Sequence, residues 1–444
     1  MDKIIKTPCG EIQGTECGLS GVIAFKGVRY AIAGRWEYPK MVTHWDGVYD
    51  ATKYGNACYQ QRAFNNESEN PKKVFYYKEF REGVTYNYSE DCLFLNVWTP
   101  ENATPDSNLP VIFYIHGGGY KSGSSDEKPF DDPIWPTKGV IAVTINYRLG
   151  PLGFLCLPEL TEEAGHSGNY GLYDQLTALK WVHENISSFG GDPNRVTIMG
   201  QSAGAMSVQD LCLSPLSDGL FSGAVMSSGC GMGNFLKATP EKIYVFWETV
   251  MSRLGCKNVD TLREIPVEKL LAEWQVARKE VKGGTFSHCP VKDGVFVVDN
   301  PIPKKIPYII GSNSHDMAPP FLFSLSKKWA IKNTENSYVY MLHRSMPGDK
   351  TGSWHSADLW YWFGTLKNCW RPFEAKDYEI SDQMTTYLCN FAKNSNPNGE
   401  KLPDWKTINS SKKSMIFGNK PTKMGKPSML RLTGIMLTTK SVGE

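Results

Sequence analysis

The segment RVTIMGQSAG at residues 195–204 constrains the fold of this chain more than any other. Its apolar, β-branched first half is typical of a buried strand, and the run stops abruptly at the pentapeptide GQSAG, residues 200–204. A stretch compatible with a helix, residues 205–212, follows directly. Strand, sharp turn and helix around G-x-S-x-G form a nucleophile elbow, in which glycines leave room for a strained serine. The segment therefore predicts that Ser202 stands at the edge of a sheet, above a helix N-terminus.

Other patterns along the chain extend this strand and helix order. Apolar runs predict strands at residues 93–98, 111–115, 140–147, 224–226, 308–310 and 337–341, with late strands near Met415 and Met429. Helical spacing of apolar residues predicts an amphipathic helix at residues 170–189, and a later helix is expected at 381–393. This alternation is typical of an α/β fold with a mostly parallel sheet.

The ends and the middle of the chain give its domain organisation. Residues 1–35 alternate short apolar runs with glycines, which predicts antiparallel β-structure at a sheet edge. Residues 239–281 are charged and helical, so a helical cap is expected to leave the sheet around residues 235–300. Because the chain has no internal repeat and no low-complexity linker, we expect residues 1–444 to form a single domain.

Charge and hydropathy argue against several classes of function. The 48 basic and 46 acidic residues give a net charge of +2 with no long single-sign run, which does not support binding to nucleic acid or to a membrane surface. No apolar stretch approaches the roughly 18 residues of a spanning helix, and the N-terminus has no apolar signal segment. We therefore expect a cytoplasmic protein. The eleven cysteines are scattered without ligand spacing, so most are expected to be buried, and no metal or cofactor is predicted.

A second motif, HGGGY at residues 116–120, directly follows the predicted strand 111–115. Its glycines leave backbone N–H groups uncovered, and in folds with the elbow such a loop supplies oxyanion-hole donors. A plain glycine-rich turn and a phosphate loop are the alternatives. The phosphate loop fails because GYKS lacks the G-K-[ST] ending and no G-x-G-x-x-G follows a strand. The two motifs in this order predict a serine hydrolase.

A nucleophilic serine needs a base, and the base needs an orienting acid. With this elbow, the acid and then the base follow the serine along the chain, each on a loop after a strand. Among eight histidines, His355 fits best, in the loop after the predicted strand 337–341. Asp316, after the predicted strand 308–310, is the favoured acid. Position alone leaves a purely structural role open for both.

Longer motifs resemble the type-B carboxylesterase family, which includes cholinesterases, bacterial carboxylesterases and fungal lipases. They run almost end to end: FKGVRYA at 25–31, EDCLFLN at 90–96, NYRLG at 146–150, GNYGLYDQ at 168–175, FGGDP at 189–193 and NSNPN at 394–398. The resemblance implies an α/β-hydrolase fold, with a large, mostly parallel central sheet, helices on both faces and an N-terminal antiparallel extension. It also implies that Ser202 is the nucleophile, His355 the base and Asp316 the acid. The same resemblance implies an oxyanion hole formed by the N–H groups of Gly118, Gly119 and Ala203.

The chain departs from the family pattern at four places. Gln201 and Asp316 stand where members usually have glutamate, which removes one negative charge and shortens one acid. Secreted members link cysteines matching Cys58 and Cys92, but without a signal segment the sequence does not decide whether this bond forms. Only 38 residues separate Asp316 from His355, where vertebrate members carry a longer helical segment. A trimmed lid with a more open entrance, as in small bacterial esterases, is therefore expected.

These observations predict a serine hydrolase that cleaves small-molecule carboxylic esters through an acyl-enzyme. The alternative from another class is a non-catalytic recognition module, which the complete set of site residues argues against. Lipase, thioesterase or amidase activity would keep the chemistry and change the substrate. Aromatic residues between 64 and 88, with Trp354 beside the base, suggest aryl or hydroxycinnamoyl esters contacted by Trp354 and Gln201. The rings could instead pack a long loop onto the body. The oligomeric state is not fixed by the sequence.

Overall fold

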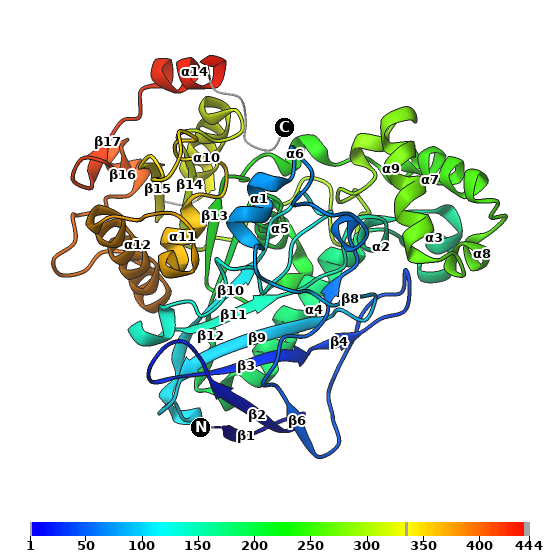
Figure 1. The fold of residues 1–444 in the computed structure, drawn as a ribbon, viewed down its shortest axis with the longest axis horizontal. Helices are drawn as coiled ribbons and strands as arrows, with labels where there is room; N and C mark the ends of the chain where they lie inside the picture. The colour runs from blue at the N-terminus through cyan, green and yellow to red at the C-terminus, as the bar shows by residue number, and fades with distance from the viewer. Residues whose placement is uncertain (1, 334–335, 439–444) are drawn as a thin grey trace.

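The computed structural model describes residues 2–333 and 336–438, and a single large sheet runs through them (Figure 1). Its strand order is β1-β2-β3-β9-β11-β10-β12-β13-β14-β15-β16-β17, with β6 paired to β2. The strands are β1 (Lys3–Thr7), β2 (Gly10–Glu16), β3 (Val22–Arg29), β6 (Val48–Asp50), β9 (Phe94–Pro100), β10 (Leu109–Ile115), β11 (Ile141–Ile145), β12 (Gly191–Gln201), β13 (Gly223–Ser227), β14 (Tyr308–Asn313), β15 (Ser337–His343), β16 (Ser414–Gly418) and β17 (Lys423–Gly425).

The pairing directions divide the sheet into a parallel centre and antiparallel ends. From β11 through β10 and on to β16, every neighbouring pair is parallel. The neighbouring pairs from β1 to β11, and the β16–β17 pair, are antiparallel, whereas the side strand β6 pairs with β2 in parallel. The expected mostly parallel sheet with an N-terminal antiparallel extension is thus confirmed.

Helices cover both faces of the sheet. They are α1 (Val74–Phe80), α2 (Gly150–Phe154), α3 (Pro158–Ala164), α4 (Tyr170–Asn185), α5 (Ala203–Leu213), α6 (Gly233–Leu236), α7 (Pro240–Leu254), α8 (Val259–Arg263), α9 (Val267–Glu280), α10 (Pro319–Asn333), α11 (Asp358–Phe363), α12 (Ala375–Asn394), α13 (Ile408–Ser411) and α14 (Met429–Thr438). Within the described ranges, none is both long and apolar enough to cross a bilayer. The strand expected near Met429 is wrong, because this segment forms the amphipathic helix α14.

The alternation of side chains along β10 shows how the core is divided. Val111, Phe113 and Ile115 join a core that also contains α4 and α5. Ile112 and Tyr114 point to the opposite face and join a core with α11 and α12. Because successive residues of a strand face opposite sides, a strand covered on both faces is apolar throughout.

Helices α7, α8 and α9 lie away from the sheet, on the right in Figure 1. With α3 they share a third apolar core, which includes Phe246, Trp247, Leu270 and Trp274. These helices fall in the range 235–300, where an excursion from the sheet is expected.

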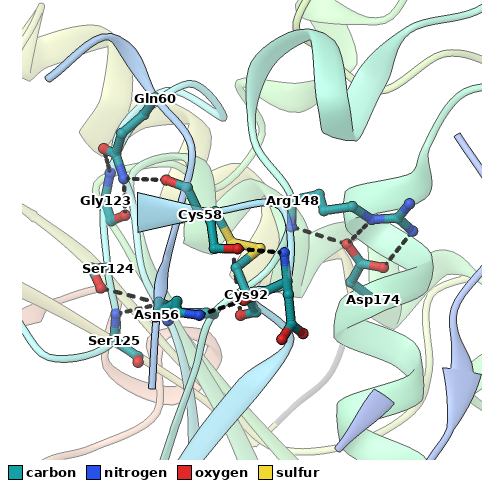
Figure 2. Close-up of a disulfide and its surroundings, with 12 residues drawn as sticks. Asn56, Cys58, Gln60, Cys92, Gly123, Ser124, Ser125, Arg148 and Asp174 are labelled. Carbon is teal, nitrogen blue, oxygen red and sulfur yellow. Dashed lines mark hydrogen bonds and ion pairs between the residues drawn. A yellow bond between two sulfur atoms is a disulfide. The ribbon is translucent and has the colours of Figure 1, made fainter. Parts of the chain in front are cut away.

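A disulfide joins Cys58 to Cys92, with their Cα atoms 5.0 Å apart (Figure 2). It closes the segment that contains the aromatic residues between positions 64 and 88. This segment is not loop throughout, because it includes helix α1. The other nine cysteines are unpaired, and most of them are buried as expected. The two thiols whose pairing the sequence left undecided are therefore joined in the folded chain.

Candidate active site

The turn between β12 and α5 has the geometry of a nucleophile elbow. Ser202 has φ 56° and ψ −123°, a backbone conformation that is costly for a residue with a side chain. A Cβ on Gly200 would lie 2.2 Å from the Gly204 oxygen, and one on Gly204 would lie 2.1 Å from the Ile115 oxygen. Both positions therefore require glycine. The Ser202 N–H donates to the Ser227 oxygen at 2.9 Å, which fixes the turn against β13.

The glycine loop after β10 lies directly beside this turn. A Cβ on Gly117 would lie 3.1 Å from the Ser202 Cβ. Gly118 has φ 106°, and a Cβ there would lie 1.9 Å from the Ser122 oxygen, so the loop closes tightly on itself. In the described chain, no turn or loop hydrogen bond uses the N–H groups of Gly118, Gly119 or Ala203. These three donors are free for a ligand oxygen next to Ser202.

The expected acid and base meet across two neighbouring strand ends. Asp316 follows β14 and His355 follows β15, and Asp316 Oδ1 lies 2.5 Å from His355 Nδ1. The carboxylate also accepts hydrogen bonds from the N–H groups of Met317, at 2.8 Å, and Asn313, at 3.1 Å. Burial by itself lowers the pKa of His355, but the charge and hydrogen bond of Asp316 outweigh it, so the pKa is raised above its ordinary value.

The other ring nitrogen of His355 faces Gln201. Since Asp316 accepts the Nδ1 proton, Nε2 carries a lone pair, and it lies 3.3 Å from the Gln201 amide nitrogen. Among the described contacts there is no hydrogen bond between His355 and Ser202. Gln201, expected to contact substrate, thus lies in the cavity wall with its amide against the base.

A second acid, Asp358, was not predicted from the sequence. It begins α11 and is fully buried, accepting hydrogen bonds from the hydroxyls of Tyr340, at 2.7 Å, and Ser227, and from the Asn313 amide at 3.2 Å. Burial raises its pKa, and its charge acts on His355. The only signal for it in the sequence is its position three residues after His355.

Ser202, Gln201 and His355 open into one cavity of about 330 Å³, within the usual range for small-molecule sites. One part of its wall is apolar, formed by Tyr76, Phe80, Phe130, Met317 and Leu359. Another part is charged, formed by Arg62, Glu67, Lys73, Arg81, Lys121 and Glu127. The sequence did not single out these charged residues, because no local pattern at positions 62–81 and 121–127 shows that their side chains face one cavity.

The expected contact between Trp354 and substrate is not supported, because the indole is fully buried and does not line the cavity. Its ring centroid lies 5.1 Å from that of Phe75 and 5.7 Å from those of Tyr76 and Phe80. The Tyr76 hydroxyl also donates to the His355 oxygen at 3.4 Å. These contacts pack α1 onto the body beside the site, so Trp354 supports the wall from behind.

No group of three or more potential metal ligands occurs among the residues that the structure describes. His116, which opens the glycine loop, is buried with its ring stacked on Tyr147 at 4.5 Å. Burial lowers its pKa to about 4. His116 therefore stays neutral and packs the loop.

The chain matches the model of the carboxylesterase family over residues 1–340 and 321–431. It belongs to this family. Para-nitrobenzyl esterase of Bacillus subtilis (strain 168) is 38% identical over 288 residues, which cover 63% of this chain and 54% of that protein. The match spans about half the length of this esterase and of acetylcholinesterase of Danio rerio.

Solved carboxylesterase-like structures agree with the fold over nearly the whole chain. One described as PNB esterase is 26% identical with a TM-score of 0.79, covering 98% of this chain and 99% of that chain. Another, described as an esterase from anaerobic Clostridium hathewayi that can hydrolyze aliphatic aromatic polyesters, is 25% identical with a TM-score of 0.82, covering 98% and 97%. The predicted α/β-hydrolase fold is thereby confirmed.

Proposed function

We propose that this chain is a carboxylic ester hydrolase that acts through an acyl-enzyme on Ser202. The observation that supports this most is the placement of Ser202 and His355 in one cavity, with Asp316 bonded to His355 and a loop with free N–H groups beside them. Membership of the carboxylesterase family supports the same chemistry.

In the first step, Ser202 Oγ attacks the ester carbonyl and its proton passes to His355 Nε2. The N–H groups of Gly118, Gly119 and Ala203 stabilise the negative charge that develops on the carbonyl oxygen. His355 then protonates the leaving alcohol as the bond to it breaks. In the second step His355 takes a proton from water, which attacks the acyl-serine. His355 returns this proton to Ser202 Oγ as the acyl bond breaks, and the free acid leaves. Asp316 holds the imidazole in place and stabilises its charged form.

The change Ser202→Ala tests this assignment. We expect kcat for p-nitrophenyl butyrate to fall by about 10⁵–10⁶, because the attacking oxygen is lost. Ser187→Ala, at an exposed position in a short 3₁₀ helix, is a matched control expected to keep full activity. Near-full activity in Ser202→Ala would contradict the proposal. Labelling of Ser202 by an organophosphonate separates a hydrolase from a recognition module, which should not react.

Aryl and hydroxycinnamoyl esters stay the proposed substrates, now supported by the apolar wall of Tyr76, Phe80 and Phe130 instead of Trp354. A related structure is described as an esterase active on aliphatic aromatic polyesters, which favours the same direction. Acetyl, butyryl, long-chain and hydroxycinnamoyl esters of one alcohol test this. Equal kcat/KM for esters of alkyl and of aryl acids would contradict the aryl preference. A higher kcat/KM for the long-chain esters would favour a lipase. The cytoplasmic location stays a prediction.

A further inference from the structure

The charged part of the cavity wall is only partly neutralised. Arg62 pairs with Glu127 at 2.7 Å, and Arg81 pairs with Glu67 at 2.6 Å and with Glu127 at 3.4 Å. Lys73 approaches Glu67 no closer than 4.0 Å, and about half of its side chain is exposed. The two carboxylates of the wall are therefore already shared by three cations.

Lys121 has no carboxylate partner among the described residues. It follows the glycine loop by two positions, and its Cε would lie 3.6 Å from a Cβ on Gly119, so the side chain runs beside the oxyanion-hole donors. The charges that act on it come from Arg278 and Lys73, with a further effect of the Cys289 thiol. Burial and the two cations lower the pKa of Lys121 to about 8.

Arg278, in the last turn of α9, is the second unpaired cation of this region. Its guanidinium lies 4.8 Å over the Trp274 ring, and its Nε is buried with no hydrogen-bond partner. No carboxylate is among the groups that act on its charge, and burial lowers its pKa. A half-buried, like-charged pair without a counter-ion is unfavourable in the free protein. A bound anion would relieve this repulsion and satisfy the free donors.

We propose that this cavity takes an ester that itself carries a carboxylate, held by Lys121 on the glycine-loop side of Ser202. Arg278 does not line the cavity and adds to the positive charge that acts on Lys121. The proposal rests on the proposed esterase function and specifies its substrate class: a monoester of a dicarboxylic acid, or an ester of an alcohol that bears an acid. The carboxylate binds as a spectator, and the atoms of the ester react as in an uncharged substrate. Lys73, at the exposed end of the same wall, adds attraction for the incoming anion.

Two matched pairs of substrates test the proposal on the full-length chain. Mono-p-nitrophenyl glutarate and p-nitrophenyl pentanoate place a carboxylate or a methyl group at the same acyl position. On the alcohol side, 4-acetoxybenzoate and 4-acetoxybenzamide place a carboxylate or a neutral carboxamide at the same ring position. We expect kcat/KM to be at least about tenfold higher for the anionic member than for the neutral member of one pair. Whether this is the acyl pair or the alcohol pair shows on which side of the ester the bound carboxylate lies.

In Lys121→Met the ratio of kcat/KM for the anionic member to kcat/KM for the neutral member should fall about tenfold or more. Lys121→Arg should keep the preference, and Lys72→Met, at an exposed lysine outside the cavity wall, should change neither member. Equal rates within both pairs for the wild type, or an equal loss on both members in Lys121→Met, would overturn the proposal.

Calorimetric titration with glutarate separates this inference from the esterase function. Glutarate binding that weakens in Lys121→Met supports the anion site, whether or not the protein hydrolyses the esters. If the wild type binds glutarate in this way but hydrolyses none of the esters, only the proposed esterase activity is contradicted. The anion site would be overturned if glutarate did not bind at millimolar concentration and the anionic and neutral esters were hydrolysed at equal rates or not at all. Tighter binding of inorganic phosphate than of glutarate would overturn the assignment to a carboxylate.

Discussion

At the scale of single residues, His355 is held by contacts on both ring nitrogens. Asp316 accepts the Nδ1 proton at 2.5 Å, and the Gln201 amide lies 3.3 Å from Nε2. The first contact raises the pKa of His355 and fixes the tautomer whose lone pair points into the cavity. The second contact uses the same lone pair that accepts the Ser202 proton in the proposed mechanism. Both neighbours should therefore set the pH dependence of the reaction.

Asp316→Asn should lower kcat by about 10⁴-fold, because the amide favours the wrong tautomer and cannot stabilise the imidazolium. The base must be neutral to act, and the pKa of His355 is raised, so wild-type kcat/KM should rise with pH through a value above 6.5. Removing the negative charge should move this acid limb to lower pH. Full pH–rate profiles of both proteins are the measurement.

Asp358→Asn is the matched control, since this acid bonds to Tyr340, Ser227 and Asn313 rather than to His355. A smaller loss of kcat than in Asp316→Asn is expected. A larger loss, with the fold retained by circular dichroism, would transfer the orienting role to Asp358.

Gln201→Glu should move the acid limb of the pH–rate profile upward by about one unit or more, because a carboxylate next to Nε2 favours the protonated ring. At neutral pH a larger fraction of His355 would then be protonated and inactive. Gln201→Ala, which removes the amide without adding charge, should leave the limb near its wild-type position. An unshifted limb in Gln201→Glu would show that residue 201 points away from the base during turnover.

At the scale of elements, the glycine loop is held from outside by the start of the aromatic segment. Gln60, which is buried, accepts from the Gly123 N–H and donates to the Gly123 oxygen, both at 2.9 Å (Figure 2). Its amide also donates to the Cys58 oxygen at 3.0 Å. The loop that carries the proposed oxyanion-hole donors is thus tied to the residues around the disulfide.

Gln60→Leu should destabilise the chain by about 1–3 kcal/mol, because it leaves the buried polar groups of Gly123 unpaired. It should also lower kcat by about tenfold or more, since small displacements of positioned groups are costly in rate. Urea unfolding and ester kinetics measure the two effects. The control is Gln61→Leu, because the Gln61 amide donates to the Leu271 oxygen and not to the glycine loop. This variant should keep the kcat of the wild type. An unchanged kcat in Gln60→Leu would mean that the loop holds its shape without this tie.

At the scale of the whole molecule, the sheet separates two apolar cores, and the site lies where the central parallel strands end. Strands β10, β12, β14 and β15 are each followed by a loop that supplies part of the site. The segment closed by Cys58 and Cys92 forms much of the remaining wall, including Tyr76 and Arg81. Its order should depend on the covalent link.

The double change Cys58→Ala/Cys92→Ala should lower the free energy of unfolding by about 3–4 kcal/mol, as expected for a cross-link between residues 34 positions apart. Dithiothreitol should shift the urea midpoint of the wild type in the same direction and leave the double variant unchanged. Cys256→Ala, at an unpaired cysteine, is the control. A wild type insensitive to reductant and no more stable than the double variant would show that the two thiols are not paired in solution.

Much of the fold could be predicted because its signals are local. The run at 195–204 specifies the strand and elbow by itself, since backbone sterics admit only glycine at Gly200 and Gly204. The buried parallel strands are visible as continuous apolar runs. The segment at Met429 was misassigned because a short apolar run fits a strand as well as a helix.

The sequence by itself determined the elbow, the glycine loop, and the chain order of the proposed acid and base, because each depends on neighbouring residues or on strand ends. Only the tertiary structure decided that Trp354 is buried, that Cys58 meets Cys92, and that Asp358 lies near the base. It alone placed Lys121 in the cavity wall without a carboxylate partner among the described residues. These contacts join segments far apart in the chain, and their distances follow from the packing of whole elements, which local patterns do not encode.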